Sequence, residues 1–123
     1  MGCGSAIPQK IINNDQLGQR VDTSDEWIKT RTGISQRRVI GEGESLIDLA
    51  TDAARNALKM AKWDEKTIDL IILATSTPDD LFGSAPKIQS NLGATNAVAF
   101  DLTAACSGFL FALVTASQYL ISG

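Results

Sequence analysis

Two short stretches of the chain are apolar without alternation. Residues 68–75 read IDLIILAT, and residues 97–103 read AVAFDLT. Continuous apolar runs of this length, rich in β-branched residues, are typical of strands that are covered on both faces of a parallel sheet. The pattern therefore predicts two buried strands.

Between and around these runs the apolar residues recur at spacings of three and four. Such spacing predicts an amphipathic helix after Ser45 whose narrow apolar face packs on a sheet. Residues 85–92 predict a shorter helix, with Ser84 as its cap, Pro86 in its first turn and Gly93 after its end. The apolar positions of the longer helix are Leu46, Leu49, Ala50, Ala53, Ala54, Ala57, Leu58 and Ala61.

The order of these elements is strand, helix, strand, helix, because a further helix follows Cys106. This order implies that the two strands pair in parallel within an α/β layer. Before Ser45, Asn13 or Asn14 is suited to cap a short helix. Residues 34–45 alternate weakly and contain a glycine-rich turn, which indicates a hairpin arm or an irregular loop.

Residues 24–31 predict another short helix. Thr23 and Glu26 have the spacing of a capping box, and Gly33 is suited to end the helix in a left-handed conformation. Trp27 and Arg31 are four residues apart, so we expect them to share one face of this helix.

The last predicted helix is apolar on every side. No charged residue occurs between Asp101 and the final Gly123. A helix of this kind has to be covered on every side. A membrane span is one possible cover, but several polar residues interrupt the run and no basic residues flank it, so we expect a further layer of protein and no membrane. The apolar residues are Phe109, Leu110, Phe111, Leu113, Val114, Tyr119, Leu120 and Ile121, and the polar ones are Ser107, Thr115, Ser117 and Gln118.

The composition narrows the class of protein. With 123 residues, 44% of them hydrophobic and 20% charged, the chain has the size and balance of one soluble domain or part of one. A net charge of −3 argues against general nucleic-acid binding. Cys3 and Cys106 form no CxxC pair or Cys/His cluster, so we expect no metal site and a reduced, cytosolic protein. The chain contains no histidine, which removes the commonest general base.

Cys106 is the candidate nucleophile. It lies where a predicted strand turns into a predicted helix, and unpaired N–H groups and the helix dipole at a helix start favour a thiolate. A thiolate is a nucleophile, and the small residues around it let a substrate approach the backbone. A buried structural thiol is the alternative, and position alone leaves both interpretations open. The small neighbours are Ala104, Ala105, Ser107 and Gly108.

Three long motifs, VDTSDEWIKTRTGI, ATSTPDDLFGSAPKIQSNLG and AFDLTAACSGFLFAL, resemble the N-terminal part of the β-ketoacyl-acyl carrier protein synthase III family. The resemblance covers nearly the whole chain in the family's order and spacing. It implies an α/β fold, the N-terminal half of a thiolase-like fold with a mostly parallel sheet and helices on both faces. Residues 1–123 would then form a single partial domain, incomplete at both ends, since the first strand is clipped and the C-terminal half is absent.

The resemblance also implies an activity. Members of this family start type II fatty acid synthesis by condensing acetyl-CoA or a similar acyl-CoA with malonyl-acyl carrier protein, and Cys106 would carry the acyl group. Acyl-CoA is a substrate, and no cofactor or metal is implied. The family uses a histidine and an asparagine from its C-terminal half, which this chain lacks, so we expect the chain as given to be an inactive fragment. A cytoplasmic homodimer is implied for the parent enzyme.

Five further residues gain candidate roles from the resemblance. Trp27 would stack on the adenine of CoA and Arg31 would lie near its nucleotide end, while Thr23 and Thr32 would contact CoA. The alternative is a core aromatic beside a solvated charge. Phe82 would cross the dimer interface and help to wall the acyl pocket, although a lone Phe can instead cap its own core.

Four basic residues form a local cluster in an otherwise acidic chain. Such a cluster suits CoA phosphates or an acidic carrier protein, and an exposed, solvated loop is the open alternative. The residues are Lys29, Arg31, Arg37 and Arg38. Cys3 lies among glycines and matches no catalytic position.

Two other functions stay open. One is a related condensing enzyme of the thiolase fold, such as a polyketide starter synthase with a different primer. The other is a non-catalytic protein that binds CoA or a carrier protein. The apolar last helix argues against the second function, because it would expose a large patch that invites aggregation.

Overall fold

The computed structural model describes residues 1–79 and 81–123, which form two compact units. The sheet unit contains Met1–Ala6 and Ser45–Gly123, and the arm unit contains Ile7–Glu44. The single partial domain of the sequence analysis stays a prediction.

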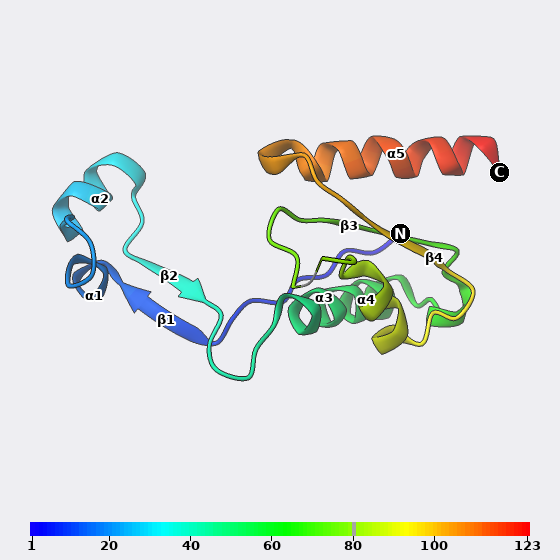
Figure 1. The fold of residues 1–123 in the computed structure, drawn as a ribbon, viewed down its shortest axis with the longest axis horizontal. Helices are drawn as coiled ribbons and strands as arrows, with labels where there is room; N and C mark the ends of the chain where they lie inside the picture. The colour runs from blue at the N-terminus through cyan, green and yellow to red at the C-terminus, as the bar shows by residue number, and fades with distance from the viewer. Residues whose placement is uncertain (80) are drawn as a thin grey trace. The chain divides into compact units, whose positions relative to one another are not determined.

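The sheet unit has three layers. Strand β3 (Leu70–Ala74) pairs in parallel with β4 (Val98–Leu102), with Leu70 opposite Val98 and Ala74 opposite Leu102. One helix lies on one side of this pair and two lie on the other (Figure 1). Both predicted strands and their parallel pairing are therefore confirmed. The helices are α5 (Gly108–Ser122) on the first side and α3 (Leu46–Ala61) and α4 (Ala85–Leu92) on the second, and short 3₁₀ turns occupy Glu65–Thr67 and Ala105–Ser107.

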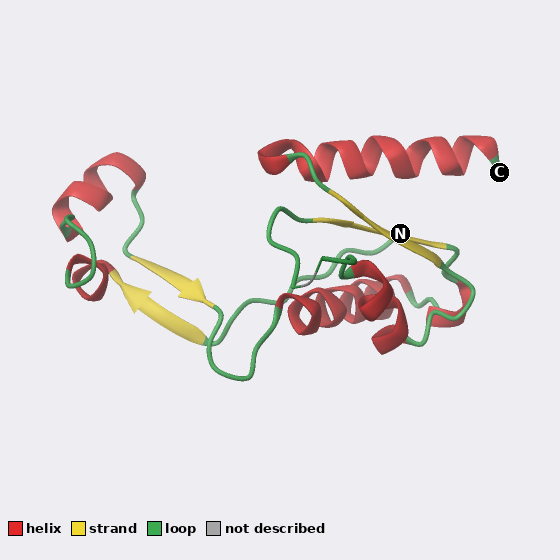
Figure 2. Ribbon diagram, in the orientation of Figure 1, coloured by secondary structure: helices red, strands yellow, loops and turns green. Residues whose placement is uncertain are grey.

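The long helix α3 begins as the sequence predicts. Ser45 is its N-cap, and the Ser45 hydroxyl accepts a hydrogen bond from the N–H of Asp48. Asp79, from the loop after β3, also accepts the N–H of Ile47 at 3.2 Å. Figure 2 shows α3 and α4 as the helical layer on one side of the strands. Capping by Ser45 and Asp79 satisfies N–H groups that have no partner inside the helix.

The start of α4 differs in part from the prediction. Ser84 occupies the N-cap position, but its side chain makes no capping bond. Instead, the Asp101 carboxylate of β4 accepts the N–H groups of Ser84 at 2.8 Å and Ala85 at 2.7 Å. The Ser84 hydroxyl is fully buried and accepts the N–H of Asp79. The predicted position of the cap at Ser84 is therefore confirmed, but the bonds that cap α4 come from Asp101, 16 or 17 positions away, which local spacing cannot reveal.

The sheet unit buries few side chains completely. Its fully covered apolar residues lie on α4 and between α4 and β4, while every residue of β3 is only half-buried. On α5 only Gly108 is buried, and the side facing away from the sheet is open. The predicted covering of this helix is thus present on its sheet side alone. The buried apolar residues are Ala85, Ile88, Ala94 and Ala97.

By length and composition, residues 105–122 have the character of a membrane-crossing helix, with a mean hydropathy of 1.4. This is weak evidence for a membrane, because a core helix of a soluble protein has the same character.

The six N-terminal residues lie along α3 instead of in the β3–β4 pair. There Asn56 donates to the carbonyl of Ser5 at 3.0 Å, and the N–H of Cys3 lies 3.3 Å from the Met60 sulfur.

The arm unit is a two-stranded ribbon that carries two helices between its strands. Strand β1 (Lys10–Asn13) pairs antiparallel with β2 (Gln36–Val39), so part of the segment predicted as a hairpin arm or an irregular loop is a strand, although two helices, and no tight turn, connect it to its partner. Helix α1 (Asn14–Gly18) begins at Asn13, which forms a capping box with Gln16. Helix α2 (Asp25–Thr32) ends at Gly33 with φ of 71°, as predicted. Its N-cap is Ser24, which accepts the N–H of Trp27, so the predicted Thr23–Glu26 capping box was wrong.

Asn14 holds the arm unit together. Its side chain is 1% exposed, and its amide donates to Asp25 at 2.9 Å and to the carbonyl of Ile34 at 2.7 Å. Its carbonyl oxygen accepts Arg37 at 2.7 Å. One buried amide therefore joins α1 to the start of α2, to the residue after the C-cap of α2 and to β2, and its loss would remove one hydrogen bond from each of these partners.

We expect Asn14→Ala to lower the free energy of local unfolding of the arm unit by about 2 kcal/mol, because it leaves buried polar groups without partners. Native-state hydrogen exchange at the amides of Arg37 and Arg38 measures this change. Asn96→Ala is the control, since the exposed Asn96 makes one bond, to the Lys66 carbonyl. Equal effects of the two substitutions would contradict the central role of Asn14.

Glu44 closes the base of the arm. Its carboxylate accepts the N–H of Gln9 at 2.9 Å and the N–H of Gly41 at 2.8 Å. The bonds from Gly41 and Gln9, with the nearby charge of Arg38, lower the pKa of Glu44 from its ordinary value of 4.5. The ionised carboxylate is therefore the form that closes the arm.

A lowered pKa sets the direction of a pH effect. The stabilisation by Glu44 is fully present above pH 4.5, the ordinary pKa, and is lost as the pH falls through the lower pKa of the folded arm. We expect the amide proton shifts of Gln9 and Gly41 to report this loss together. In Glu44→Gln, which cannot ionise, the shared titration should disappear, and its persistence would assign it to another group.

Candidate functional site

Cys106 lies in the turn between β4 and α5. It is a free, exposed thiol and the middle residue of the 3₁₀ turn Ala105–Ser107. The first bond of this turn runs from the N–H of Ser107 to the carbonyl of Ala104 at 3.0 Å. The N–H of Cys106 precedes that bond, as donors at the start of a helix do. The predicted position between strand and helix is confirmed, and exposure argues against the buried structural thiol.

The turn has an unusual backbone. Ala105 adopts φ of 45°, one of two non-glycine residues with positive φ in the described part of the chain. Residues other than glycine occupy this region at a cost, and such strain recurs where a sharp strand-to-helix turn presents a nucleophile. Gly108 then starts α5 against β3, where a Cβ would lie 3.4 Å from the Cβ of Ala74. Small residues were predicted here, but the sequence carries no signal for the positive φ of Ala105.

The loops that follow β3 and β4 are joined at one edge of the sheet. The Thr103 hydroxyl donates to the carbonyl of Thr75, and the N–H of Thr75 donates to the carbonyl of Leu102. Carboxyl ends of parallel strands are the usual place for a site in an open α/β sheet. Cys106 follows the end of β4 at this edge.

Phe82 belongs to the loop that follows β3. It is 91% exposed, and its neighbour Leu81 is 92% exposed. An open hollow of about 350 Å³ lies between this loop and β4, with Phe82, Gly83, Phe100 and Asp101 among its lining residues. Phe82 does not cap the core of its own unit, so the alternative of the sequence analysis does not hold, and its role in a dimer stays a prediction.

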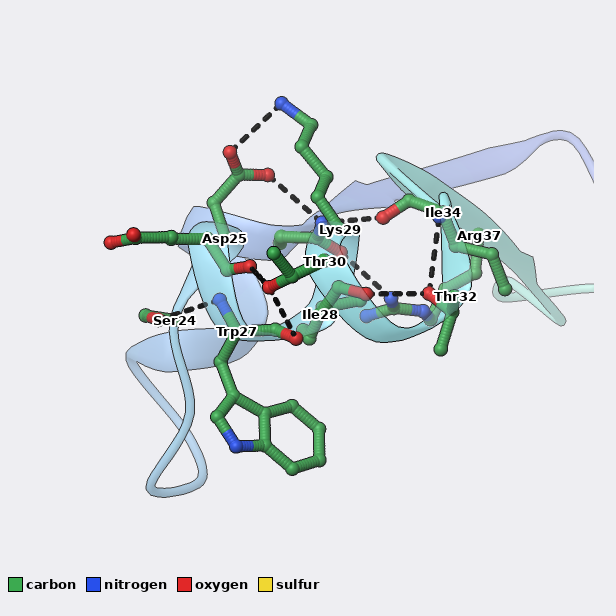
Figure 3. A network of polar contacts seen from close by, with 11 residues as sticks. Ser24, Asp25, Trp27, Ile28, Lys29, Thr30, Thr32, Ile34 and Arg37 are labelled. Atoms are coloured by element: carbon green, nitrogen blue, oxygen red, sulfur yellow. Dashed lines mark hydrogen bonds and ion pairs between the residues drawn. The ribbon is translucent and has the colours of Figure 1, made fainter.

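Trp27 and Arg31 form a stacked pair on α2. The Arg31 guanidinium carbon lies 4.4 Å from the centre of the Trp27 ring, which confirms that the two share a face. Figure 3 shows the indole pointing away from the other labelled side chains, and Trp27 is 53% exposed. A core aromatic would be covered, so this interpretation is excluded for Trp27. A cation over one face of an indole holds the ring in place and leaves a flat apolar surface for a ligand.

The two predicted threonines differ in their surroundings. The Thr32 hydroxyl donates to the carbonyl of Ile28 at 2.7 Å and accepts the N–H of Ile34 at 3.1 Å (Figure 3). It therefore completes the end of α2 in this structure. Thr23 is half-buried and precedes the N-cap Ser24. A contact of either threonine with CoA stays a prediction.

The predicted basic cluster is largely engaged in internal contacts. Lys29 pairs with Asp25 at 2.8 Å, and Arg38 donates to the carbonyl of Pro8 at 2.8 Å. Arg37 donates to the buried Asn14. These bonds orient the three cations toward the arm itself, which favours a structural role over an open anion patch.

The ion pair between Lys29 and Asp25 changes the pKa of both side chains. Hydrogen bonds from Lys29 and then Asn14 lower the pKa of Asp25, and the bond with Asp25 raises the pKa of Lys29. Both side chains are exposed by a third or more, so water screens the pair and its contribution to stability is small.

Among the residues that the structure describes, no group of three or more His, Cys, Asp or Glu side chains is placed to hold a metal.

The candidate residues thus fall into two sets. Cys106 and Phe82 belong to the sheet unit, at loops that follow its two strands. Trp27, Arg31 and the two threonines belong to the arm unit. The role of Asp101, and that of Asn14 beyond a possible helix cap, were not predicted, because their partners lie far away in the sequence.

Comparison with known proteins gives the family. No family model matches the chain. All 123 residues align at 87% identity with β-ketoacyl-[acyl-carrier-protein] synthase III of Prochlorococcus marinus (strain NATL2A). The crystal structure of 3-oxoacyl-[acyl-carrier-protein] synthase III from Aquifex aeolicus VF5 matches with a TM-score of 0.94 and 46% identity, over 99% of this chain and 40% of that chain. The priming β-ketosynthase of the R1128 polyketide biosynthetic pathway matches with a TM-score of 0.87 and 39% identity, over 91% of this chain and 34% of that chain.

The match covers only part of these proteins. The chain spans 36% of the length of the Prochlorococcus relative. The predicted α/β class, part of a thiolase-like fold, is confirmed by the match to solved synthases. In sequence along its whole length, and in fold, the chain belongs to the β-ketoacyl-[acyl-carrier-protein] synthase III family.

Proposed function

We propose that this chain supplies the acyl-accepting cysteine of an acyltransferase that starts type II fatty acid synthesis. The enzyme condenses acetyl-CoA, or a similar acyl-CoA, with malonyl-acyl carrier protein. The observation that carries this proposal is the exposed Cys106 thiol in the strained turn before α5, within a chain that matches synthases of this family along its whole length.

The first half-reaction is a transfer between two sulfur atoms. The Cys106 thiolate attacks the carbonyl carbon of the acyl-CoA thioester, a new carbon–sulfur bond forms, and the carbonyl oxygen becomes negatively charged. Collapse of this intermediate breaks the bond to CoA, which leaves as a thiolate. The N–H of Cys106 is suited to stabilise the oxyanion, because it precedes the first hydrogen bond of its turn.

The second half-reaction forms the carbon–carbon bond. Malonyl-acyl carrier protein loses carbon dioxide, its carbanion attacks the acyl carbon on Cys106, and the cysteine leaves as a thiolate. In this family a histidine and an asparagine stabilise the carbanion, and this chain contains no histidine. The residues of this chain therefore serve the first half-reaction, and the chain alone is not expected to condense the two substrates.

The arm unit would bind the CoA. A nucleotide base stacks on a flat indole, and a guanidinium pairs with phosphate, so the stacked Trp27 and Arg31 offer both contacts. The exposed Phe82 would contribute to the acyl pocket of a second subunit in a homodimer. We place the parent enzyme in the cytoplasm as a soluble protein.

A related starter synthase of polyketide synthesis is the second candidate function. The similarity to the R1128 priming β-ketosynthase favours it, but that identity of 39% is lower than the 46% to the Aquifex synthase and the 87% to the Prochlorococcus relative. Comparison of acetyl-CoA with longer acyl-CoA primers separates the two candidates. A strong preference for a longer primer would favour the polyketide enzyme.

We expect the natively expressed protein that contains this chain to gain one acetyl group on incubation with acetyl-CoA. Intact-mass spectrometry before and after incubation measures the gain, and peptide mapping assigns it to Cys106. Cys106→Ala should abolish the gain because it removes the nucleophile. Cys3→Ala is the matched control, since Cys3 is the other exposed thiol. Acetylation that persists in Cys106→Ala would refute the proposed nucleophile.

We expect Trp27→Ala to raise the KM for acyl-CoA about tenfold with little change in kcat, because base stacking contributes equally to ground-state and transition-state binding. Steady-state kinetics over a range of acyl-CoA concentrations measure both constants. Trp63→Ala serves as the control, because Trp63 is a similarly exposed indole of the sheet unit. Equal rises of KM in the two variants would argue against stacking by Trp27.

A further inference from the structure

The backbone that carries Phe82 is tied to β4 by one carboxylate. Asp101 accepts the N–H groups of Ser84 and Ala85, which follow Phe82 by two and three residues. Gly83 adopts φ of 95° against the same carboxylate, where a Cβ would lie 3.4 Å from the Asp101 carboxyl carbon. Asp101 therefore bonds to Ser84 and Ala85 and leaves little room for a side chain at Gly83.

Packing against the strand contributes less to this segment. The open hollow of about 350 Å³ lies between residues 81–83 and β4, and both Leu81 and Phe82 are more than 90% exposed. The direction of the Phe82 side chain depends on the backbone that bears it, and bonds to Asp101 orient that backbone. Charge-assisted bonds to an ionised acceptor are stronger than neutral ones, and the N-terminus of α4 favours the negative charge.

The same strand also leads to the nucleophile. Residues 102–105 alone separate Asp101 from Cys106 along the chain. Thr103, within this stretch, donates to the carbonyl of Thr75 at the start of the loop that follows β3. The backbone next to Phe82 is thus hydrogen-bonded to the carboxyl end of β4, and Cys106 follows that end along the chain.

We propose that Asp101 is a positioning residue for primer selection. Its carboxylate fixes residues 81–85 relative to the end of β4 and so determines the position of the Phe82 side chain. That position in turn determines which length of acyl chain the acyl pocket accepts. This inference rests on the proposed function, in which Cys106 accepts the acyl group and Phe82 helps to wall an acyl pocket. Asp101 itself does not touch the substrate in this scheme.

The test measures acylation of Cys106 by acetyl-CoA and by hexanoyl-CoA in the natively expressed protein that contains this chain. In Asp101→Asn an amide NH₂ replaces one of the two acceptors, which breaks a bond to α4 while keeping the shape. We expect the ratio of the two acylation rates to change about tenfold, the size of effect that a reshaped apolar pocket produces. Asp69→Asn, an exposed carboxylate next to β3, should leave the ratio unchanged.

A double-mutant cycle separates positioning from general destabilisation. If Asp101 acts through Phe82, then Asp101→Asn should not change the ratio further in a Phe82→Ala background. Gly83→Ala is a second, milder variant, because an alanine is strained at φ of 95° and should move the same segment. It provides the test if Asp101→Asn does not fold.

The outcomes are distinguishable. A changed ratio that vanishes in the Phe82→Ala background supports positioning by Asp101. An unchanged ratio in Asp101→Asn and Gly83→Ala, with Cys106 still acylated, overturns the positioning role and leaves the proposed function intact. Additive effects of Asp101→Asn and Phe82→Ala also overturn it. Absence of acylation in the unsubstituted protein overturns the proposed function and this inference with it.

Discussion

The hydrogen bonds from the start of α4 to the Asp101 carboxylate join this helix, and the loop before it, to the strand that leads to Cys106. A half-buried carboxylate within a strand needs partners, and two backbone N–H groups of a helix N-terminus provide them together with a favourable dipole. The pairing fixes α4 against β4 and the end of the loop after β3 against the same strand. Because only residues 103–105 separate the end of β4 from Cys106, the proposed nucleophile is attached to the same strand.

Most elements were predictable because their signals are local. The apolar runs, the start of a helix after Ser45 and the end of a helix at Gly33 each depend on residues within a few positions, and the structure has them as expected. The N-terminal capping bonds of α2 and α4 were not predictable. Thr23 and Ser24 are equally suited by type to cap α2, and the N–H of Ser84 is bonded by Asp101 of β4. Asn14 was considered only as a helix cap, whereas its partners are distributed over 23 residues of the sequence.

The candidate site shows the same division. The cysteine, the stacked Trp27–Arg31 pair and the small residues of the turn follow from residue type and spacing. The positive φ of Ala105 does not, because alanine carries no preference for that region and only the surrounding structure can hold it there. For the basic cluster, composition left an anion site and a solvated loop both open, and the structure adds that Lys29, Arg37 and Arg38 are engaged by the arm itself.

The absence of histidine in the chain is compatible with a nucleophile at Cys106, since a thiol differs from a hydroxyl in what it needs. A serine at this turn would require an adjacent base, whereas a thiol at a helix start gains thiolate character from backbone N–H groups. In the proposed function, the first transfer to Cys106 would therefore draw on the backbone N–H groups of the turn itself. Stabilising a carbanion from decarboxylation demands separate donors aimed at a different atom. The two half-reactions of the proposed function thus place separable demands on the protein, and the residues of this chain are suited to the first.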